Sequence, residues 1–327
     1  MDKRNEHKGS GAFGGRGGGA GRNGERDRGG KPAAPGNRDR RPVGGRAAAP
    51  GGQPDNRGRD ERAHGREQER EHEAGAEQEQ YIAGKHSILE ALRAGRTINK
   101  IWVAEGAQKH HVHDILTEAK AAGIIVQTAD KRKLDQLVSD VPHQGVIAQA
   151  AAYAYVEVED ILAIAERRGE PPFLLILDEI EDPHNLGSIL RTADCTGVHG
   201  VIIPKRRSAQ LTATVSKTSA GAVEYVAVAR VTNLVQTIEK LKERGVWIGG
   251  ADGAAKQEAY RADLTIPLAL VIGNEGSGIG RLVKESCDFL VKLPMFGRIN
   301  SLNASVAASV LMYEAVRQRM GASQPAR

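Results

Sequence analysis

Short apolar segments alternate with stretches of helical periodicity from Phe173 to Arg319. The first of them, residues 173–178 (FLLILD), is apolar at nearly every position, which is typical of a strand covered on both faces. We expect further strands at residues 200–204, 225–229, 246–249, 268–272 and 289–293. The alternation of such strands with helices predicts an α/β fold, built as a parallel sheet with crossover helices.

A smaller α/β unit is expected ahead of this sheet. Its strands are predicted at residues 98–104, 124–128 and 146–150, with helices between them. We therefore divide the chain into a small domain (81–152), a linker with one helix (153–170) and a main domain (171–322).

The first 80 residues differ from the rest in composition. They hold 19 of the 39 glycines and neither leucine nor isoleucine. So few apolar side chains cannot offset the entropy lost on ordering, and we expect a disordered tail. Residues 1–62 carry 15 basic and 8 acidic side chains, so the net charge of +5 arises mainly there. The Arg-Gly-Gly segments at 16–18 and 28–30 suit an accessory RNA tether.

The composition excludes several classes of protein. The two cysteines, Cys195 and Cys287, are too few for a disulfide framework or a four-thiolate metal site, and we expect two buried free thiols in a reducing cytosol. No apolar run approaches the roughly 20 residues of a membrane span, and no apolar segment of a secretory signal follows the N-terminus. These features predict a cytoplasmic protein without a metal or a membrane partner.

Polar residues follow the first strand of the main domain. The loop 182–187 (DPHNLG) leads into a helix that carries Arg191. Asn185 is a candidate N-cap of that helix, and Arg191 could form a surface ion pair with Asp194.

A glycine-rich loop, residues 272–280 (IGNEGSGIG), follows a later strand and contains Glu275. Glycines let a ligand approach the backbone closely. The loop lacks the G-x-G-x-x-G spacing of a dinucleotide site and the Lys-Ser/Thr end of a P-loop. It therefore suits a small ligand held by backbone groups, and a dinucleotide oxidoreductase is disfavoured.

A third loop joins the last strand to an Ala-rich helix. It reads LPMFGRINSLNASVA over residues 293–307, and either Ser301 or Asn303 could cap the helix.

Three patterns occur in order along the main domain: N-x5-R-T-A, I-G-N-E-G-x-G and L-P-M-x-G-x3-S-L-N-x-S-V-A. Together they resemble the three signature motifs of the SpoU/TrmH family of RNA ribose 2′-O-methyltransferases, which belongs to the SPOUT class. The resemblance covers about 150 residues of the main domain. Residues 81–150 are similar to the family's small substrate-binding domain, and this layout is most similar to that of the bacterial 23S rRNA guanosine 2′-O-methyltransferases.

The resemblance implies a trefoil-knotted α/β domain, in which the C-terminal part of the chain threads through a loop. It also implies a homodimer with its active sites at the subunit interface, and S-adenosylmethionine as cofactor. Gly249, Gly273, Leu293 and Leu302 are the implied cofactor-binding residues. The implied catalytic residues are Arg191, which would act from the other subunit, and Asn185, Glu275, Ser301 and Asn303.

The implied reaction is S-adenosylmethionine-dependent 2′-O-methylation of a ribose in RNA, with a guanosine of 23S rRNA as the expected target. The alternatives are a tRNA ribose methyltransferase and a non-catalytic RNA-binding ribosome-assembly factor. Methyl transfer needs in-line positioning and stabilisation of alkoxide charge. A guanidinium is a poor base because its pKa exceeds about 12, so Arg191 is expected to hold a phosphate and stabilise charge.

Overall fold

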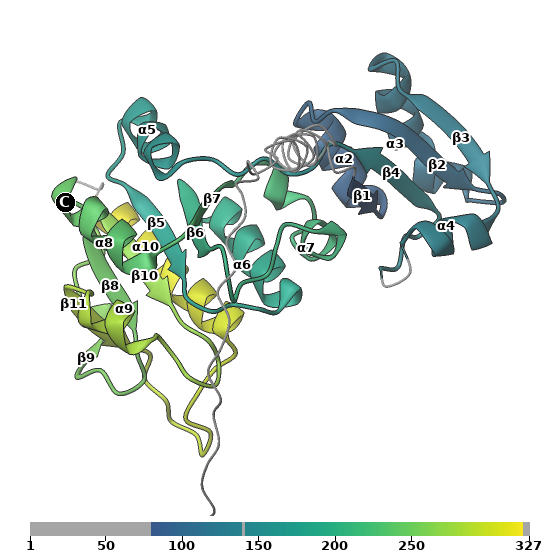
Figure 1. Cartoon of the computed structure of the whole chain (residues 1–327). Coiled ribbons are helices and arrows are strands. Elements are labelled where there is room, and N and C mark those ends of the chain that lie inside the picture. Colours follow the sequence, from purple (N-terminus) through teal and green to yellow (C-terminus); the bar gives the residue numbers. More distant parts are fainter. Residues whose placement is uncertain (1–79, 139–140, 323–327) are drawn as a thin grey trace, which may run out of the picture. The chain divides into compact units, whose positions relative to one another are not determined.

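The computed structural model describes residues 80–138 and 141–322 (Figure 1). The tail expected to be disordered therefore lies outside the described residues, except for Gln80.

The main domain contains a seven-stranded sheet, as far as the described residues extend, in the order β7-β6-β5-β10-β8-β11-β9. All of its neighbouring strands are parallel, which confirms the predicted α/β class. The strands are β5 (Phe173–Leu177), β6 (Gly200–Pro204), β7 (Ala227–Val231), β8 (Trp247–Ala251), β9 (Gln257–Glu258), β10 (Leu268–Ile272) and β11 (Phe289–Lys292).

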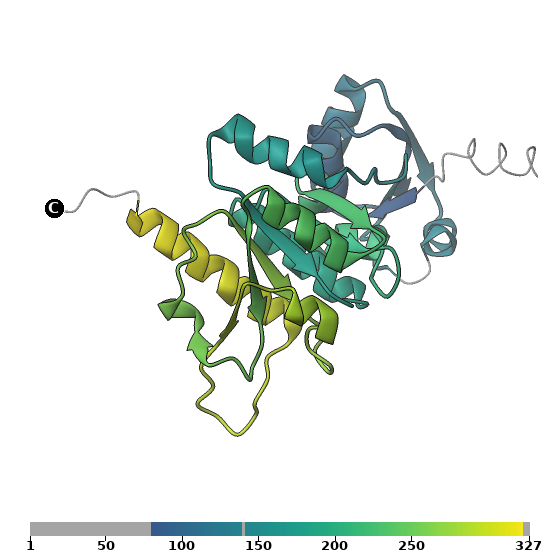
Figure 2. The ribbon, with the colours of Figure 1, turned by 60° about the vertical axis from the view of Figure 1, so that its left-hand side comes forward.

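Helices cover both faces of this sheet. Alternate residues of β5 belong to different cores: Phe173, Leu175 and Leu177 pack with α6 and α10, whereas Leu174 and Ile176 pack with α5, α8 and α9. This two-sided burial is the reason that the strand is apolar at every position. Figures 1 and 2 show α6 and α10 side by side along one face. The helices are α5 (Val158–Arg168), α6 (Pro183–Cys195), α7 (Ala213–Thr218), α8 (Leu234–Glu243), α9 (Arg281–Glu285) and α10 (Ala304–Ala322).

The strand order brings late and early segments together. β10 lies between β5 and β8, with Ile272 opposite Leu177. β11 lies beside β8, with Val291 opposite Ala251. Because these strands are parallel, their carboxyl ends and the loops that follow them gather at one edge of the sheet. The threading of the chain through a loop stays a prediction.

The small domain is a four-stranded sheet in the order β1-β4-β2-β3, in which only β2 and β3 are parallel. Its first strand was not predicted, because four residues with one apolar pair carry little periodicity. The strands are β1 (Gln80–Ala83), β2 (Ile98–Ala104), β3 (Ile125–Ala129) and β4 (Val146–Ala150), and the helices are α2 (Lys85–Arg93), α3 (Lys109–Ala121) and α4 (Lys131–Leu137).

Two further predictions require correction. The strand expected at 225–229 begins two residues later, because residues 222–224 form a 3-10 turn. Cys195 is exposed at the end of α6 and is therefore not a buried thiol. Cys287 is half-buried, and burial raises the pKa of its thiol to about 11, so it stays protonated near neutral pH.

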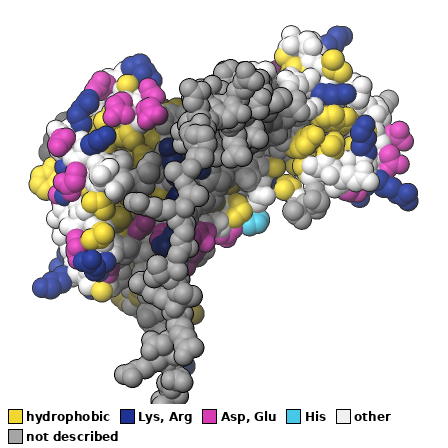
Figure 3. Space-filling view, in the orientation of Figure 1, with side chains coloured by type: hydrophobic (Ala, Val, Ile, Leu, Met, Phe, Trp, Pro, Cys, Tyr) yellow, Lys and Arg dark blue, Asp and Glu magenta, His cyan; other side chains and the backbone are white. Residues whose placement is uncertain are grey.

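The surface carries both signs of charge, and basic and acidic side chains are interspersed on the face that Figure 3 shows. Within the described residues, no helix is long and apolar enough to cross a membrane, and no cluster of three or more His, Cys, Asp or Glu side chains could hold a metal ion.

The end of α10 is fastened to the start of the main domain. The guanidinium of Arg319 donates to the carbonyl oxygens of Pro171, Pro172, Leu264 and Ile266 at 2.8–3.2 Å. It also lies 4.6 Å from the centre of the Phe173 ring. One side chain therefore ties the last helix to the segments that begin β5 and β10.

We expect Arg319→Met to lower the free energy of unfolding by roughly 2–4 kcal/mol, because four carbonyl oxygens lose a charged donor. Chemical denaturation measures this loss. Arg317→Ala on the same helix is the matched control, since it removes only an exposed ion pair with Glu314 and should change stability by less than about 1 kcal/mol. Equal effects of the two substitutions would contradict the proposed fastening.

Candidate active site

A cavity of about 210 Å³ lies at the carboxyl ends of β8, β10 and β11. Its lining comes from three loops of the main domain. These loops are far apart along the chain and are brought together by the order of the strands in the sheet. The lining residues include Ala251, Asp252 and Gly253, then Ile272, Gly273, Asn274, Glu275 and Gly278, and then Leu293, Met295, Asn300, Ser301 and Leu302.

The middle loop is a tight turn that leaves no room for a side chain at Gly273. A Cβ atom at this position would lie 2.2 Å from the carbonyl carbon of Gly278. Asn274 and Gly278 exchange two backbone hydrogen bonds of 3.1 and 2.9 Å. Gly278 has a φ of +69°, which glycine adopts without strain. The turn therefore places its backbone directly against the cavity.

Two residues after β5 hold this turn in place. The carboxylate of Asp178 accepts from the backbone N–H of Gly280 at 2.7 Å, and the carbonyl of Glu179 accepts from the side-chain amide of Asn274 at 3.1 Å. Asp178 is buried, and this burial raises the pKa of its carboxyl group. Asp178 was not among the predicted site residues, although a carboxylate at the end of an apolar strand was a usable signal.

Three predicted catalytic residues meet in an amide–carboxylate cluster, which we define as Asn185, Glu275 and Asn303. Glu275 Oε1 accepts from the side-chain amides of both asparagines, at 3.2 Å from Asn303. Asn303 Nδ2 also donates to Asn185 Oδ1 at 2.9 Å. Each of the three motif loops therefore contributes one member of the cluster.

The prediction that Asn185 is the N-cap of α6 is wrong. Asp182 is the cap, and its carboxylate accepts from the backbone N–H of His184 at 2.8 Å. Pro183 opens the helix, so it begins earlier than expected. Asn185 thus lies inside the first turn, where its side chain is free to enter the cluster.

Asn303 caps α10 and is thus the one of the two candidates, Ser301 and Asn303, that fills this role. Its Oδ1 accepts from the backbone N–H groups of Ser305 and Val306 at 3.0 and 3.3 Å, and from the Ser305 hydroxyl at 2.6 Å. The same side chain therefore starts the last helix with its oxygen and joins the cluster with its nitrogen.

The remaining predicted residues divide into two groups. Gly273, Leu293, Ser301 and Leu302 line the cavity. Gly249 lies inside β8 against the Phe289 ring and is not among the lining residues, which begin at Ala251.

Arg191 makes no hydrogen bond or ion pair with the cluster within the described residues. Its side chain is exposed on α6, six residues after Asn185. The ion pair with Asp194 that the sequence allowed is not formed. The guanidinium is therefore available to a partner from outside this chain.

Comparison with known families supports both domains. Residues 172–313 match the SpoU rRNA Methylase family, and residues 81–156 match the family described as RNA 2′-O ribose methyltransferase substrate binding. YacO of Bacillus subtilis (strain 168), which is assigned to the TrmH family of tRNA/rRNA methyltransferases, is 54% identical over 244 residues. That alignment covers 75% of this chain and 98% of YacO.

Solved structures show the same architecture. The SpoU methyltransferase AviRb of Streptomyces viridochromogenes, crystallised with S-adenosylmethionine, aligns with a TM-score of 0.63 and 25% identity. The alignment covers 74% of this chain and 91% of AviRb. A structure described as an RNA 2′-O ribose methyltransferase aligns with a TM-score of 0.62 and 26% identity, over 75% of this chain and 90% of the other.

We expect Gly273→Ala to disrupt the turn and to destabilise the protein by about 2 kcal/mol or more, because the added carbon overlaps the Gly278 backbone. Thermal unfolding and amide hydrogen exchange over 273–280 measure both effects. Gly276→Ala in the same loop is the control, since its added carbon would lie no closer than 3.4 Å to a neighbouring atom. Unchanged exchange in Gly273→Ala would show that this close approach is not needed.

Proposed function

Because the chain belongs to the SpoU/TrmH family of RNA methyltransferases, we propose that it methylates the 2′-hydroxyl of a ribose in RNA, using S-adenosylmethionine. We further propose that the target is a guanosine of 23S rRNA, methylated in the cytoplasm. The observation that carries the proposal is the convergence of all three motif loops on one cluster beside one cavity.

The cavity suits S-adenosylmethionine. Its walls combine backbone groups of the Gly273 turn with the apolar side chains of Leu293, Met295 and Leu302. Such a lining can bind a nucleoside through backbone hydrogen bonds and apolar contacts without a pyrophosphate site. When bound, S-adenosylmethionine supplies the methyl group, as a carbon attached to a positively charged sulfur.

The remaining requirements concern the ribose hydroxyl. It must be placed in line with the methyl group, and its oxygen must be stabilised as it gains negative charge. We assign Arg191 to this task, as a clamp on the neighbouring phosphate, with the proton passing to a phosphate oxygen or water. Glu275, Asn185 and Asn303 keep the motif loops in register, and Ser301 completes the polar wall.

The small domain supports ribosomal RNA as the substrate. Residues 81–156 match a substrate-binding family, and a separate RNA-binding domain suits a large folded RNA in which a single ribose must be found. A transfer RNA substrate is the alternative, since the assignment of YacO names both kinds of RNA.

A homodimer is part of the proposal. Val306, Val310 and Tyr313 are exposed at positions i, i+4 and i+7 of α10, so they lie on one face of the helix. An apolar stripe of this kind beside the cavity suits a second copy of the chain. Arg191 of one subunit would then serve the cavity of its partner.

Mapping of 2′-O-methyl groups on total RNA from a deletion strain tests the function. We expect the loss of one methyl group in 23S rRNA, restored by the intact gene. A loss confined to tRNA would replace the rRNA substrate. Calorimetric titration with S-adenosylmethionine tests the alternative of a non-catalytic RNA-binding ribosome-assembly factor. A failure to bind would leave only that role.

We expect Arg191→Lys to lower kcat at least about tenfold, which corresponds to about 1.4 kcal/mol of transition-state stabilisation. Lysine keeps the charge but loses the planar, two-pronged donor geometry. Single-turnover methylation assays measure the change, and the affinity for S-adenosylmethionine should stay the same. Near-normal turnover would exclude a bidentate role for Arg191.

Sharing of sites between subunits predicts complementation. In a purified heterodimer of Arg191→Ala and Asn303→Ala chains, one cavity keeps Asn303 and receives Arg191 from the other chain. We expect about half of wild-type activity from this heterodimer, because one of two symmetric sites is intact. If Arg191 serves its own subunit, both sites are damaged, and the heterodimer should be as inactive as either homodimer.

A further inference from the structure

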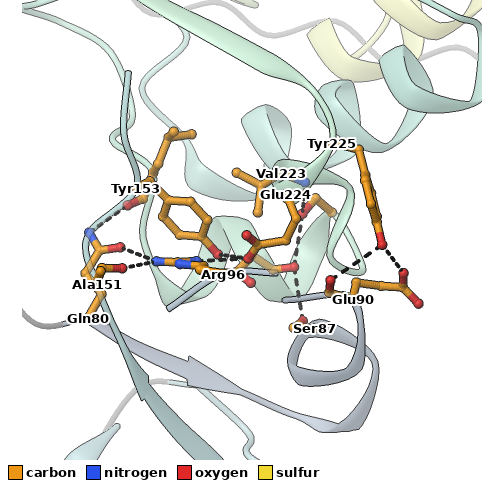
Figure 4. Close-up of polar contacts among 12 residues, drawn as sticks. Gln80, Ser87, Glu90, Arg96, Ala151, Tyr153, Val223, Glu224 and Tyr225 are labelled. Carbon is orange, nitrogen blue, oxygen red and sulfur yellow. Dashed lines mark hydrogen bonds and ion pairs between the residues drawn. The ribbon is translucent and has the colours of Figure 1, made fainter. Parts of the chain in front are cut away.

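The two domains meet over a buried ion pair between Arg96 of the small domain and Glu224 of the main domain (Figure 4). Arg96 Nη1 lies 2.9 Å from Glu224 Oε1, and the two side chains are only 9% and 5% exposed. Removal of one partner from such a pair would leave a buried charge uncompensated, so the two domains are strongly coupled at this point.

Tyr153 completes this contact. The Arg96 guanidinium lies 3.5 Å from the centre of its ring, and its hydroxyl donates to Glu224 Oε1 at 3.0 Å. Burial, followed by the nearby Glu224 carboxylate, raises the pKa of Tyr153, so the hydroxyl stays protonated and remains a donor. Tyr153 belongs to the segment between the domains, which is therefore part of the contact.

The rest of that segment is also fixed. Arg96 donates to the carbonyl of Ala151. The backbone N–H of Val156 donates to Val228 in β7 at 3.0 Å, and the Tyr155 hydroxyl accepts from the backbone N–H of Leu211 at 3.1 Å. Residues 151–156 are thus bound along their length rather than forming a free tether.

Close packing surrounds the ion pair. The buried Ser87 hydroxyl of α2 donates to the carbonyl of Ser216 in α7 at 3.1 Å. At Gly221 a Cβ atom would lie 2.6 Å from the Cβ of Glu90, so the backbone of the main domain touches α2 directly. Lys217 also donates to the carbonyl of Pro142 in the small domain.

The docking surface continues to the amide–carboxylate cluster. α7 packs against the start of α6, where a Cβ atom on Gly187 would overlap the Thr218 side chain. Asn185 lies two residues before Gly187 in the same helix. The small domain therefore rests on elements that also hold the cluster.

We propose that Arg96, Glu224 and Tyr153 are positioning residues, which hold the small domain at a fixed place so that RNA bound to it presents one ribose to the cavity. This inference rests on the proposed function. It implies that a fixed distance between the small domain and the cavity determines which ribose is methylated. A domain that only raised the local concentration of RNA would not need this fixed distance.

Arg96→Met in the full-length protein is the first test. We expect faster amide hydrogen exchange over 151–156, with unchanged affinity for S-adenosylmethionine. This readout does not depend on the RNA substrate. Addition of Glu224→Gln should restore part of the protection, because the double variant buries no unpaired charge.

Methylation kinetics provide the second test, on two lengths of the RNA that the mapping experiment identifies. Arg96→Met should lower kcat/KM at least tenfold on a long fragment that reaches the small domain, but leave the rate on an oligonucleotide of about ten nucleotides unchanged. Tyr225→Phe is the control, because it removes only two exposed hydrogen bonds to Glu90 at the rim of the same contact.

The outcomes distinguish the failure of the positioning role from the failure of the proposed methyltransferase function. Equal losses on both RNA lengths, or unchanged exchange over 151–156, would overturn the positioning role while leaving methyl transfer established. If the wild-type protein methylates no RNA, the proposed function fails, and the exchange data still decide whether the ion pair fixes the domains.

Discussion

The architecture of the candidate active site depends on hydrogen bonds among three amide and carboxylate side chains. Glu275 is 90 residues from Asn185 in the sequence, and Asn303 is 118 residues from it, yet the three are in contact. Each of the three side chains is bonded to a residue of another loop. Their mutual bonding therefore specifies how the loops after β10 and β11 meet the first turn of α6. The cavity walls follow from that arrangement, because Gly273, Ser301 and Leu302 belong to the same loops.

Much of this could be predicted from the sequence. The two-sided burial of β5 was readable from its unbroken apolar run, since a strand inside a sheet that helices cover on both faces is buried at every position. The three motif loops were also found, and five of the nine predicted site residues line the cavity, namely Gly273, Glu275, Leu293, Ser301 and Leu302. Local chemistry limited the cap of α10 to Ser301 or Asn303, because capping involves only near neighbours in the chain.

Other features could not be read because they depend on distant partners. Asn185 looks like an N-cap until Asp182 is seen to fill that role and Glu275 to bind its amide. The buried Arg96–Glu224 pair joins residues 128 positions apart, and each alone resembles an ordinary surface charge. The four-residue strand β1 gains its identity only from pairing with β4. In each case the deciding partner lies outside any local sequence window.

The position of β10 has a consequence for how the chain reaches its fold during synthesis. β5 pairs with β10 along one edge, and these strands end 95 residues apart, at Leu177 and Ile272. At a synthesis rate of about 5–20 residues per second, β10 is made roughly 5 to 20 s after β5. During this time the edge of β5 that pairs with β10 is unpaired, and every residue of β5 is apolar. The wait is longer for α10, whose Arg319 binds the segment that begins β5. An exposed apolar edge is an aggregation hazard, so a nascent chain released before residue 272 would be a substrate for chaperones.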